Sequence, residues 1–309
     1  HCMTDIATVT QQLLAQAGKV VSGKDEVVRL AWVAILSDGH VLLEDLPGVG
    51  KTSLAQTLGR LLSLDYQRVQ FTSDLLPADV IGAQVYRREQ ESFQFHPGPV
   101  FTQLLLADEL NRATPKAQSA LLEAMEEGQV SSDGVTHALP VPFHVIATQN
   151  PQSQAGTYPL PESQLDRFFM RLSLGYPDLE SEKGLLSGTR GRSQLADLKP
   201  ILTTERLQTF KTEVEAVKAS DAVLNYVMRL VHSSRESGLC RLGLSPRGAL
   251  ALMTAARAMA LVEGRRYVMP DDVQRVFPAV AGHRIQGQRE HDTAVLVQQI
   301  LDEVDVIAA

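Results

Sequence analysis

Residues 40–52, HVLLEDLPGVGKT, have the types and spacing of a loop that can hold a triphosphate. An apolar run leads into a loop with Pro47 and two glycines, and a helical pattern begins at Lys51. Glycines let backbone amides turn inward around phosphate oxygens, and the helix N-terminus adds partial positive charge. Lys51 can reach the β- and γ-phosphates, and the Thr52 hydroxyl can ligate Mg²⁺. The residues that we expect to surround the phosphates are Pro47, Gly48, Val49, Gly50, Lys51, Thr52 and Ser53.

Asp45 departs from the strict pattern G-x-x-x-x-G-K-[ST], because it occupies the position of the first glycine. A glycine-rich turn in front of an ordinary helix therefore stays open as an alternative. The order of strand, tight loop and helix is the context that a phosphate-binding loop requires. This context favours nucleotide binding.

Asp108 and Glu109 follow the apolar run LLLA at residues 104–107. A buried strand would deliver both carboxylates at its carboxyl end, where ligands of open α/β sheets bind. Asp108 could then hold Mg²⁺, and Glu109 could orient or deprotonate the water that attacks the γ-phosphate. A solvated carboxylate pair at a strand end is the alternative for this motif alone, and the preceding phosphate loop argues against it.

Three further side chains are candidates for contacts with the γ-phosphate. Asn150 ends another apolar run, although an Asn in a turn before Pro151 would look the same. Arg167 lies in LPESQLDRF, and Arg247 lies in LSPRG, in the first turn of a predicted helix. Either arginine alone could equally form a surface salt bridge, but an arginine that reaches the γ-phosphate raises turnover by ~10³–10⁵.

Strands that alternate with helices indicate one α/β domain with a parallel sheet covered on both faces. We predict a five-stranded αβα sandwich at residues 1–177 and an all-helical lid domain at 178–309, with the boundary near Pro177. The predicted strands are 41–45, 66–71, 103–107, 143–148 and 171–175. The predicted helices of the second domain are 178–188, 203–217, 221–236, 246–263 and 290–306.

Composition and charge exclude several classes of protein. The chain has 309 residues, 44% hydrophobic and 21% charged, without an apolar run of the ~18–20 residues that a membrane-spanning helix needs. Its two cysteines, Cys2 and Cys240, give neither a disulfide framework nor a thiolate zinc site, and they indicate a reducing, cytoplasmic setting. The net charge of −7 opposes strong nonspecific binding to nucleic acid.

Several longer strings of residues resemble the MoxR family of AAA+ ATPases. The resemblance covers nearly the whole chain after residue 20, and it includes Asp45, which this family usually shows in its phosphate loop. The strings are LEDLPGVGKT (43–52), LLADELNRA (105–113), KAQSALLEAMEE (116–127), ATQNP (147–151), LPESQLDRF (160–168), LSPR (244–247) and YVMPDDV (267–273).

The resemblance implies a Mg²⁺-dependent ATPase that acts in a ring, commonly a hexamer, and matures or activates other proteins. It implies a client protein and a partner with a von Willebrand factor A domain. Two predicted hairpins, at 84–95 and 129–141, would face a central pore and present Tyr86 and Phe93 to the client, although purely structural hairpins fit as well. The implied roles are Lys51 and Thr52 on phosphate and Mg²⁺, Asp108 on Mg²⁺, Glu109 as base, Asn150 as sensor 1, Arg247 as sensor 2 and Arg167 as arginine finger, with Arg171 as a substitute finger and Arg112 near the subunit interface.

Three other functions stay open at this point. The same branch of AAA+ proteins includes motors that act on nucleic acid, but no DNA-binding module is recognisable here. A motor subunit of a metal chelatase would work by a similar mechanism. A scaffold that binds ATP and scarcely hydrolyses it is the third, and the intact set of Asp108, Glu109 and Asn150 argues against it.

Overall fold

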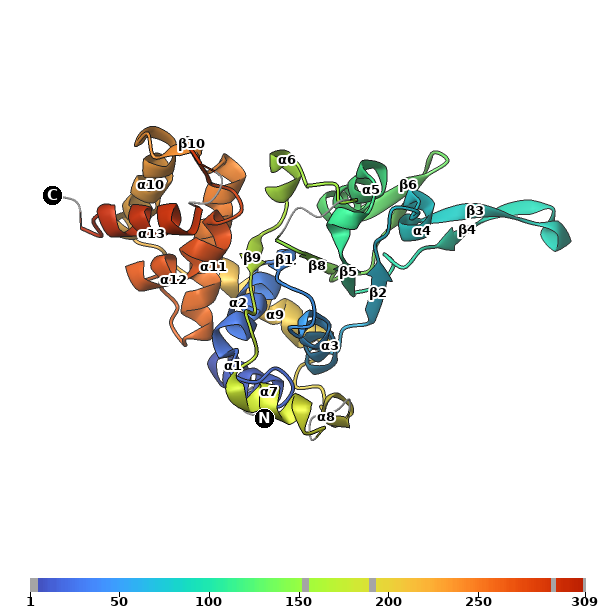
Figure 1. Ribbon diagram of the computed structural model, residues 1–309, viewed down its shortest axis with the longest axis horizontal. Helices are drawn as coiled ribbons and strands as arrows, with labels where there is room; N and C mark the ends of the chain where they lie inside the picture. The colour runs from blue at the N-terminus through green and yellow to red at the C-terminus, as the bar shows by residue number, and fades with distance from the viewer. Residues whose placement is uncertain (1–4, 152–155, 189–192, 290–292, 308–309) are drawn as a thin grey trace.

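The computed structural model describes residues 5–151, 156–188, 193–289 and 293–307, and within them a five-stranded parallel sheet forms the centre of the first domain (Figure 1). Its strand order is β2 (Tyr66–Gln70), β5 (Leu104–Asp108), β8 (His144–Gln149), β1 (Val41–Glu44) and β9 (Met170–Leu172). The five predicted strands are thereby confirmed. Because parallel strands are covered on both faces, their apolar runs need no alternation with polar residues.

Successive residues of each central strand enter different cores, as the pleat of a strand requires. Leu104 and Leu106 of β5 pack into one core with α3 (Lys51–Leu61). Leu105 and Ala107 pack on the opposite face, against α5 (Pro115–Glu127). The helix that follows the phosphate loop and the helix that follows the Asp108-Glu109 pair are therefore held on opposite faces of the sheet.

The second half of the chain is helical, as predicted (Figure 1). One helix, α12, was missed by the sequence patterns, as were the short β10 and β11 and the small helices α4 (Pro77–Ile81), α6 (Glu162–Leu165) and α8 (Ser193–Ala196). The first residues of the predicted helix 290–306 lie outside the described residues. The elements from residue 179 onward, apart from α8, are α7 (Leu179–Leu186), α9 (Thr204–Glu215), α10 (Asp221–Glu236), β10 (Cys240–Leu242), α11 (Pro246–Val262), α12 (Pro270–Ala281), β11 (Gln286–Gly287) and α13 (Thr293–Glu303).

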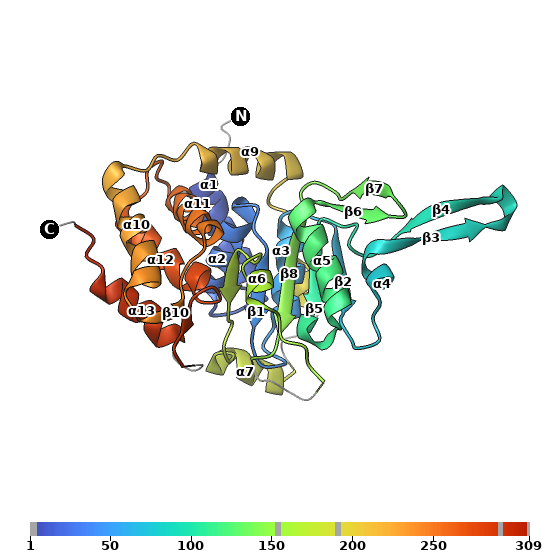
Figure 2. The same ribbon diagram turned by 90° about the horizontal axis from the view of Figure 1, so that it is seen from above.

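The first two helices, α1 (Ile6–Ala17) and α2 (Asp25–Leu36), contribute to the same hydrophobic core as α9, α11 and α12. Figure 2 shows α1 and α2 between the sheet and α11. Trp32 of α2 is fully buried there, and its indole N–H donates to the Thr10 hydroxyl (3.0 Å). The N-terminal helices thus connect the sheet to the helical half, and the boundary near Pro177 stays a prediction.

A long hairpin, β3 (Gly82–Arg87) with β4 (Ser92–Pro97), projects far beyond the sheet (Figures 1 and 2). Tyr86 and Phe93 are directly opposed in its register, with ring centroids 5.3 Å apart, and they are 52% and 69% exposed. The shorter hairpin, β6 (Gln129–Ser132) with β7 (Val135–Ala138), lies beside it. The ring of His137 stacks on Phe95 at 3.8 Å and so joins the two hairpins.

Two histidines, His40 and His144, form hydrogen bonds at the amino edge of the sheet, where the strands begin. The Nδ1 of His40 accepts the Val145 N–H (3.0 Å), so its Nε2 donates to the Met125 carbonyl (3.2 Å). The buried His144 contacts Lys211 of α9 through Nε2 (2.9 Å), and Lys211 also pairs with Asp38 (2.5 Å). Burial lowers the pKa of His40 to about 4, and burial together with the Lys211 charge holds the pKa of His144 well below 6.5.

These histidines predict a loss of stability in mild acid. A folded-state pKa of about 4 lies below the ordinary value of 6.5, so the stabilisation is complete above pH 6.5 and is lost as the pH falls toward 4. One such group changes the free energy of unfolding by at most ~1.4 kcal/mol per pH unit in that window. Urea unfolding at pH 7 and pH 5 measures it. The His40→Gln variant should be less stable at pH 7 but show a smaller loss between the two, and an unchanged loss would contradict this account.

Candidate nucleotide site

The phosphate loop runs from the end of β1 to the first turn of α3, as predicted. Gly48 (φ +83°) and Gly50 (φ +99°) both adopt left-handed backbone conformations, which glycine enters at little cost. A Cβ atom at either position would meet no neighbour within 4 Å, so the backbone angle and not the space requires glycine. The Lys51 ammonium donates to the Asp45 carbonyl (3.1 Å) across the loop. These features fit a cradle of amides for phosphate oxygens.

Asp45 has a structural role that explains the departure from the usual loop pattern. Its carboxylate is buried and accepts hydrogen bonds from the Ser173 hydroxyl (2.6 Å) and from the backbone N–H groups of Leu174 (2.7 Å) and Gly175 (3.1 Å). Charge-assisted bonds of this kind are stronger than neutral ones. Asp45 therefore ties the start of the phosphate loop to the segment that leaves β9 toward the helical half.

The two predicted carboxylates lie at the carboxyl end of β5, where Thr148 of the neighbouring strand β8 bonds to the carboxylate of Asp108 and to the backbone of Glu109. The Thr148 hydroxyl donates to Asp108 Oδ1 (2.6 Å) and accepts the Glu109 N–H (2.9 Å). Glu109 has a left-handed backbone (φ +55°), which costs a residue other than glycine about 1–3 kcal/mol. This bond to Thr148 stabilises that turn and directs Glu109 out of the strand.

Strand β2 supplies two partners that the sequence patterns did not single out. The Arg68 guanidinium pairs with Asp108 Oδ2 (2.7 Å) and donates to the Gln70 side-chain oxygen (2.7 Å). The Gln70 amide in turn donates to Glu109 Oε2 (2.9 Å), and Arg112 lies 3.5 Å from the same oxygen. In this state both candidate catalytic carboxylates are engaged by side chains of their own chain.

Asn150 directly follows β8, whose last residue, Gln149, pairs with Glu44 of β1 in the sheet register. The Gln149 amide donates to the Glu44 carboxylate (2.8 Å). Asn150 lines a small cavity together with Glu44, Asn111 and Thr157. The ends of β1, β5 and β8 thus bring the phosphate loop, the acidic pair and Asn150 to one edge of the sheet.

A cavity of about 420 Å³ adjoins the phosphate loop and has the size of a small-molecule site. Its floor is formed by residues 48–50 and Ser53, and its walls include Val20, Val21, Pro177 and Leu185. The purine base of a nucleotide needs apolar walls close to the loop that holds its phosphates. This cavity has apolar walls and adjoins that loop. The sequence patterns did not single out residues 20–24, because an apolar wall has no motif of its own.

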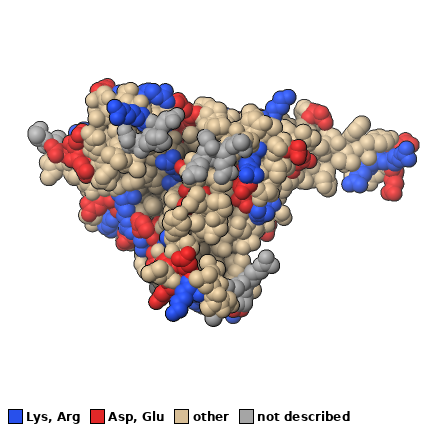
Figure 3. All heavy atoms as spheres, in the orientation of Figure 1, with Lys and Arg blue, Asp and Glu red and all other residues tan. Residues whose placement is uncertain are grey.

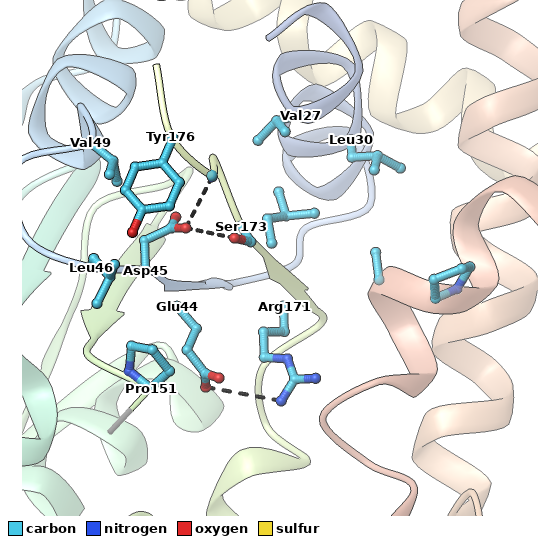
Figure 4. Close-up of a pocket in the computed structure, with 14 residues that line it drawn as sticks. Val27, Leu30, Glu44, Asp45, Leu46, Val49, Pro151, Arg171, Ser173 and Tyr176 are labelled. Carbon is cyan, nitrogen blue, oxygen red and sulfur yellow. Dashed lines mark hydrogen bonds and ion pairs between the residues drawn. The ribbon is translucent and has the colours of Figure 1, made fainter. Parts of the chain in front are cut away.

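A larger cavity, of about 560 Å³, lies on the other side of the loop (Figure 4). It is bounded by Leu46 and Val49, by α2, and by Pro278 of α12, and Asp45 and Arg171 line it. Arg171 lies 3.9 Å from Glu44 and donates to the Gly282 carbonyl (3.0 Å). Gly48, Gly50 and Ser53 line the smaller cavity and not this one, so the smaller cavity is the one that adjoins the turn of the phosphate loop.

The remaining two predicted site residues lie together elsewhere. Arg167 (3.0 Å) and Arg247 (2.6 Å) both pair with Glu126, in the last turn of α5. Two guanidinium groups that share one carboxylate leave positive charge in excess at this point. The three side chains are half-buried to exposed, and the Glu126 carboxylate holds the two arginines side by side.

Glu126 belongs to the amino edge of the sheet. Met125, its neighbour, accepts a hydrogen bond from the His40 ring, and Phe169 N–H donates to the His40 carbonyl (2.8 Å) just before β1 begins. The carboxyl edge lies a strand length away, of the order of 10–20 Å at about 3.3 Å per residue. The predicted site residues therefore form two groups at opposite edges of the sheet.

In the view of Figure 3, acidic and basic side chains are interspersed, and the projecting hairpin carries both signs of charge at its tip. Across the described residues, no helix is long and apolar enough to cross a membrane. Nor do three or more His, Cys, Asp or Glu side chains cluster in those residues as ligands for a metal ion.

Comparison with known proteins assigns both halves of the chain. Residues 40–170 match the model of the ATPase family associated with various cellular activities (AAA), and residues 232–304 match that of the AAA lid domain. A crystal structure of a protein from Cytophaga hutchinsonii, which carries only a provisional ATPase name, superposes with a TM-score of 0.89 at 36% identity. The match covers 98% of this chain and 96% of that one, which confirms the α/β core with a helical lid.

Two curated relatives match nearly as far. Protein YeaC of Bacillus subtilis, whose function is not characterised, is 42% identical over 98% of this chain and 96% of its own length. Chaperone MoxR1 of Mycobacterium tuberculosis is 41% identical over 89% of this chain and 75% of its own length. The chain therefore belongs to the MoxR family of AAA+ ATPases.

Proposed function

We propose that this chain is a Mg²⁺-dependent ATPase that acts in a ring, with six copies as the resemblance implies. We propose that its cycle of ATP binding and hydrolysis remodels a partner protein. The observation that carries the proposal is the separation of the site residues into two groups. Asp108, Glu109 and the Lys51 loop lie at the carboxyl edge of the sheet, and Arg167 and Arg247 lie at the amino edge on Glu126. A single copy cannot bring both groups to one phosphate.

At the carboxyl edge, each side chain has a distinct task. Lys51 and the loop amides would bind the phosphates, and Thr52 and Asp108 would hold Mg²⁺, which neutralises charge on the transferred phosphoryl group. Glu109 would accept a proton from the attacking water once Gln70 releases its carboxylate, and Asn150 would orient that water. Arg68 must also leave Asp108 for the carboxylate to face a metal ion.

At the amino edge, Arg167 and Arg247 would act on the nucleotide of the neighbouring copy. A guanidinium is planar and matches phosphate oxygens bidentately. Their partner Glu126 holds them through half-exposed pairs, which contribute only ~1 kcal/mol or less each and are easily exchanged for phosphate. We assign Arg167 as the finger and Arg247 as the sensor, both acting in trans.

The projecting hairpin is our candidate for client contact. Exposed aromatic side chains on an extended arm are unfavourable in water unless a partner covers them, and Tyr86 and Phe93 form such a pair. The name of the M. tuberculosis relative, a chaperone, supports action on proteins. We also propose a partner with a von Willebrand factor A domain, as the family resemblance implies. A cytoplasmic location completes the proposal, because ATP is available there and the free thiol of Cys240 fits a reducing compartment.

A Glu109→Gln trap tests the client assignment. Held in the ATP state, this variant should retain client proteins that the ADP state releases, and Tyr86→Ser with Phe93→Ser in the same chain should abolish the retention. Co-purified proteins are identified with ATP, with ADP and with the hairpin variant. If the same proteins are retained with ATP, with ADP and by the hairpin variant, the hairpin does not contact clients. If nucleic acid is retained instead and is released by salt, the alternative of a motor that acts on nucleic acid is favoured.

A further inference from the structure

Arg284, which follows α12, is a buried charge whose hydrogen bonds all go to the loop that carries Arg167 or to its own helix. Its side chain is 3% exposed. Its Nε donates to the Asp166 carboxylate (2.8 Å), and its two terminal nitrogens donate to the carbonyls of Asp166 (3.0 Å), Phe169 (2.9 Å) and Val280 (2.8 Å). A buried arginine is stable only with its charge and donors satisfied in this way.

His283 extends the same contact by one residue. Its Nε2 donates to the Phe168 carbonyl (2.6 Å), and the ring is buried. Burial and the Arg284 charge keep the pKa of His283 well below 6.5, so the ring stays neutral at pH 7. The dipeptide His283-Arg284 therefore holds the carbonyls of residues 166, 168 and 169, which flank Arg167 on both sides.

Asp166, which Arg284 holds, also contacts the helix turn that carries Arg247. The Ser245 hydroxyl donates to the Asp166 carboxylate (2.9 and 3.1 Å) and caps α11 by accepting the Gly248 N–H (3.0 Å). A Cβ atom on Gly248 would lie 2.9 Å from Cδ of Arg284, so only glycine lets the guanidinium pass beneath this turn. Arg247 lies between Ser245 and Gly248. The first turn of α11 and the Arg167 loop are therefore fixed to one another through Asp166 and Arg284.

We propose that His283 and Arg284 are positioning residues for the two arginines offered to the neighbouring copy. They make Arg167, Arg247 and the C-terminal end of α12 one rigid unit, so a movement of the helical half moves both guanidinium groups together. Neither residue touches the chain's own phosphate loop. This inference rests on the proposed action of Arg167 in trans.

The Arg284→Gln variant tests the inference. Gln cannot replace the pair with Asp166 and the three carbonyl bonds, so turnover should fall about 10–100-fold toward that of Arg167→Ala, whereas binding of a fluorescent ATP analogue should stay within about twofold. Mixing Arg284→Gln with Lys51→Ala copies should restore turnover, because each supplies what the other lacks. Mixing it with Arg167→Ala should not. Arg284→Lys should recover part of the activity.

Arg265→Gln is the matched control, since Arg265 pairs with Asp272 inside the helical half and contacts nothing in the Arg167 loop. It should lose stability but not turnover. If Arg284→Gln does not fold, Gly248→Ala crowds the Arg284 side chain without removing a polar group and should give the same mixing behaviour. Near-normal turnover in the Arg284 and Gly248 variants, or failure of a folded one to complement Lys51→Ala, would overturn the inference. If Arg167→Ala also fails to complement Lys51→Ala, the proposed function itself is wrong.

Discussion

Replacing Glu109 by Gln is expected to lower ATP turnover by about 10²–10⁴-fold, the usual contribution of a general base. Gln has the same shape, so the left-handed turn and the Thr148 bond to the Glu109 N–H should persist. The amide cannot accept a proton from water. Binding of ATP depends on the Lys51 loop and should be unchanged. Phosphate release and binding of a fluorescent ATP analogue measure the two effects separately.

Glu127→Gln is a suitable control for that variant. Glu127 is exposed at the end of α5 and has no place in the proposed site, so its turnover should equal that of the unmodified chain. If Glu109→Gln retains more than about a tenth of the normal rate, the loss falls below what a general base contributes. Glu109 would then not be the base.

Replacing Arg167 by Ala is expected to lower turnover on the order of 10³-fold, the lower end of the range for an arginine at the γ-phosphate. The free energy of unfolding should fall only slightly, because the ion pair of Arg167 with Glu126 is half-exposed and contributes ~1 kcal/mol or less. Nucleotide affinity of the chain's own loop should stay within a few-fold. Steady-state phosphate release, thermal unfolding and nucleotide titration distinguish the three quantities.

Arg266→Ala provides the comparison for Arg167. Arg266 lies in an exposed pair with Glu213, at 3.8 Å, within the helical half. Its loss removes one surface charge without touching either edge of the sheet, and turnover should not change. A loss of similar size in both variants would mean that the effect of Arg167→Ala reflects general charge and not a contact with phosphate.

The sheet and the phosphate loop could be predicted because their determinants are local. An apolar run leads straight into the loop with Gly48, Gly50 and Lys51, and the central strands β1, β5 and β8 are short, nearly continuous runs of buried residues. Parallel pairing then aligns the strand ends without further information. Such local signals explain why the acidic pair and Asn150 were also placed at the correct edge.

Helix α12 shows where local signals mislead. Pro278 lies inside it, and proline in a helix interior removes a hydrogen bond and disfavours the helix in any pattern-based reading. The start of the helix was readable: Pro270 occupies the first turn, and the Asp272 carboxylate accepts the Met269 N–H (2.7 Å). Burial of Val273, Phe277 and their neighbours outweighs the cost of the proline.

The partners within the site could not be predicted, because they depend on contacts between distant segments. Arg68 and Gln70 reach the acidic pair only through the pairing of β2 with β5, and Thr148 only through that of β5 with β8. Glu126 meets Arg247 across more than a hundred residues of sequence. In the sequence alone, nothing distinguishes these polar residues from others, because their partners become neighbours only in the folded chain.

The central claim is that each site is completed by the neighbouring copy, and a mixing experiment tests it most directly. Arg167→Ala copies keep an intact phosphate loop, and Lys51→Ala copies keep an intact arginine. With random mixing in a ring, about a quarter of the interfaces at equal proportions combine the two intact parts. We predict that two nearly inactive preparations regain turnover on mixing, with a maximum near equal proportions. Turnover that stays at the sum of the separate preparations, at every ratio and with rings shown to exchange copies, would contradict the account.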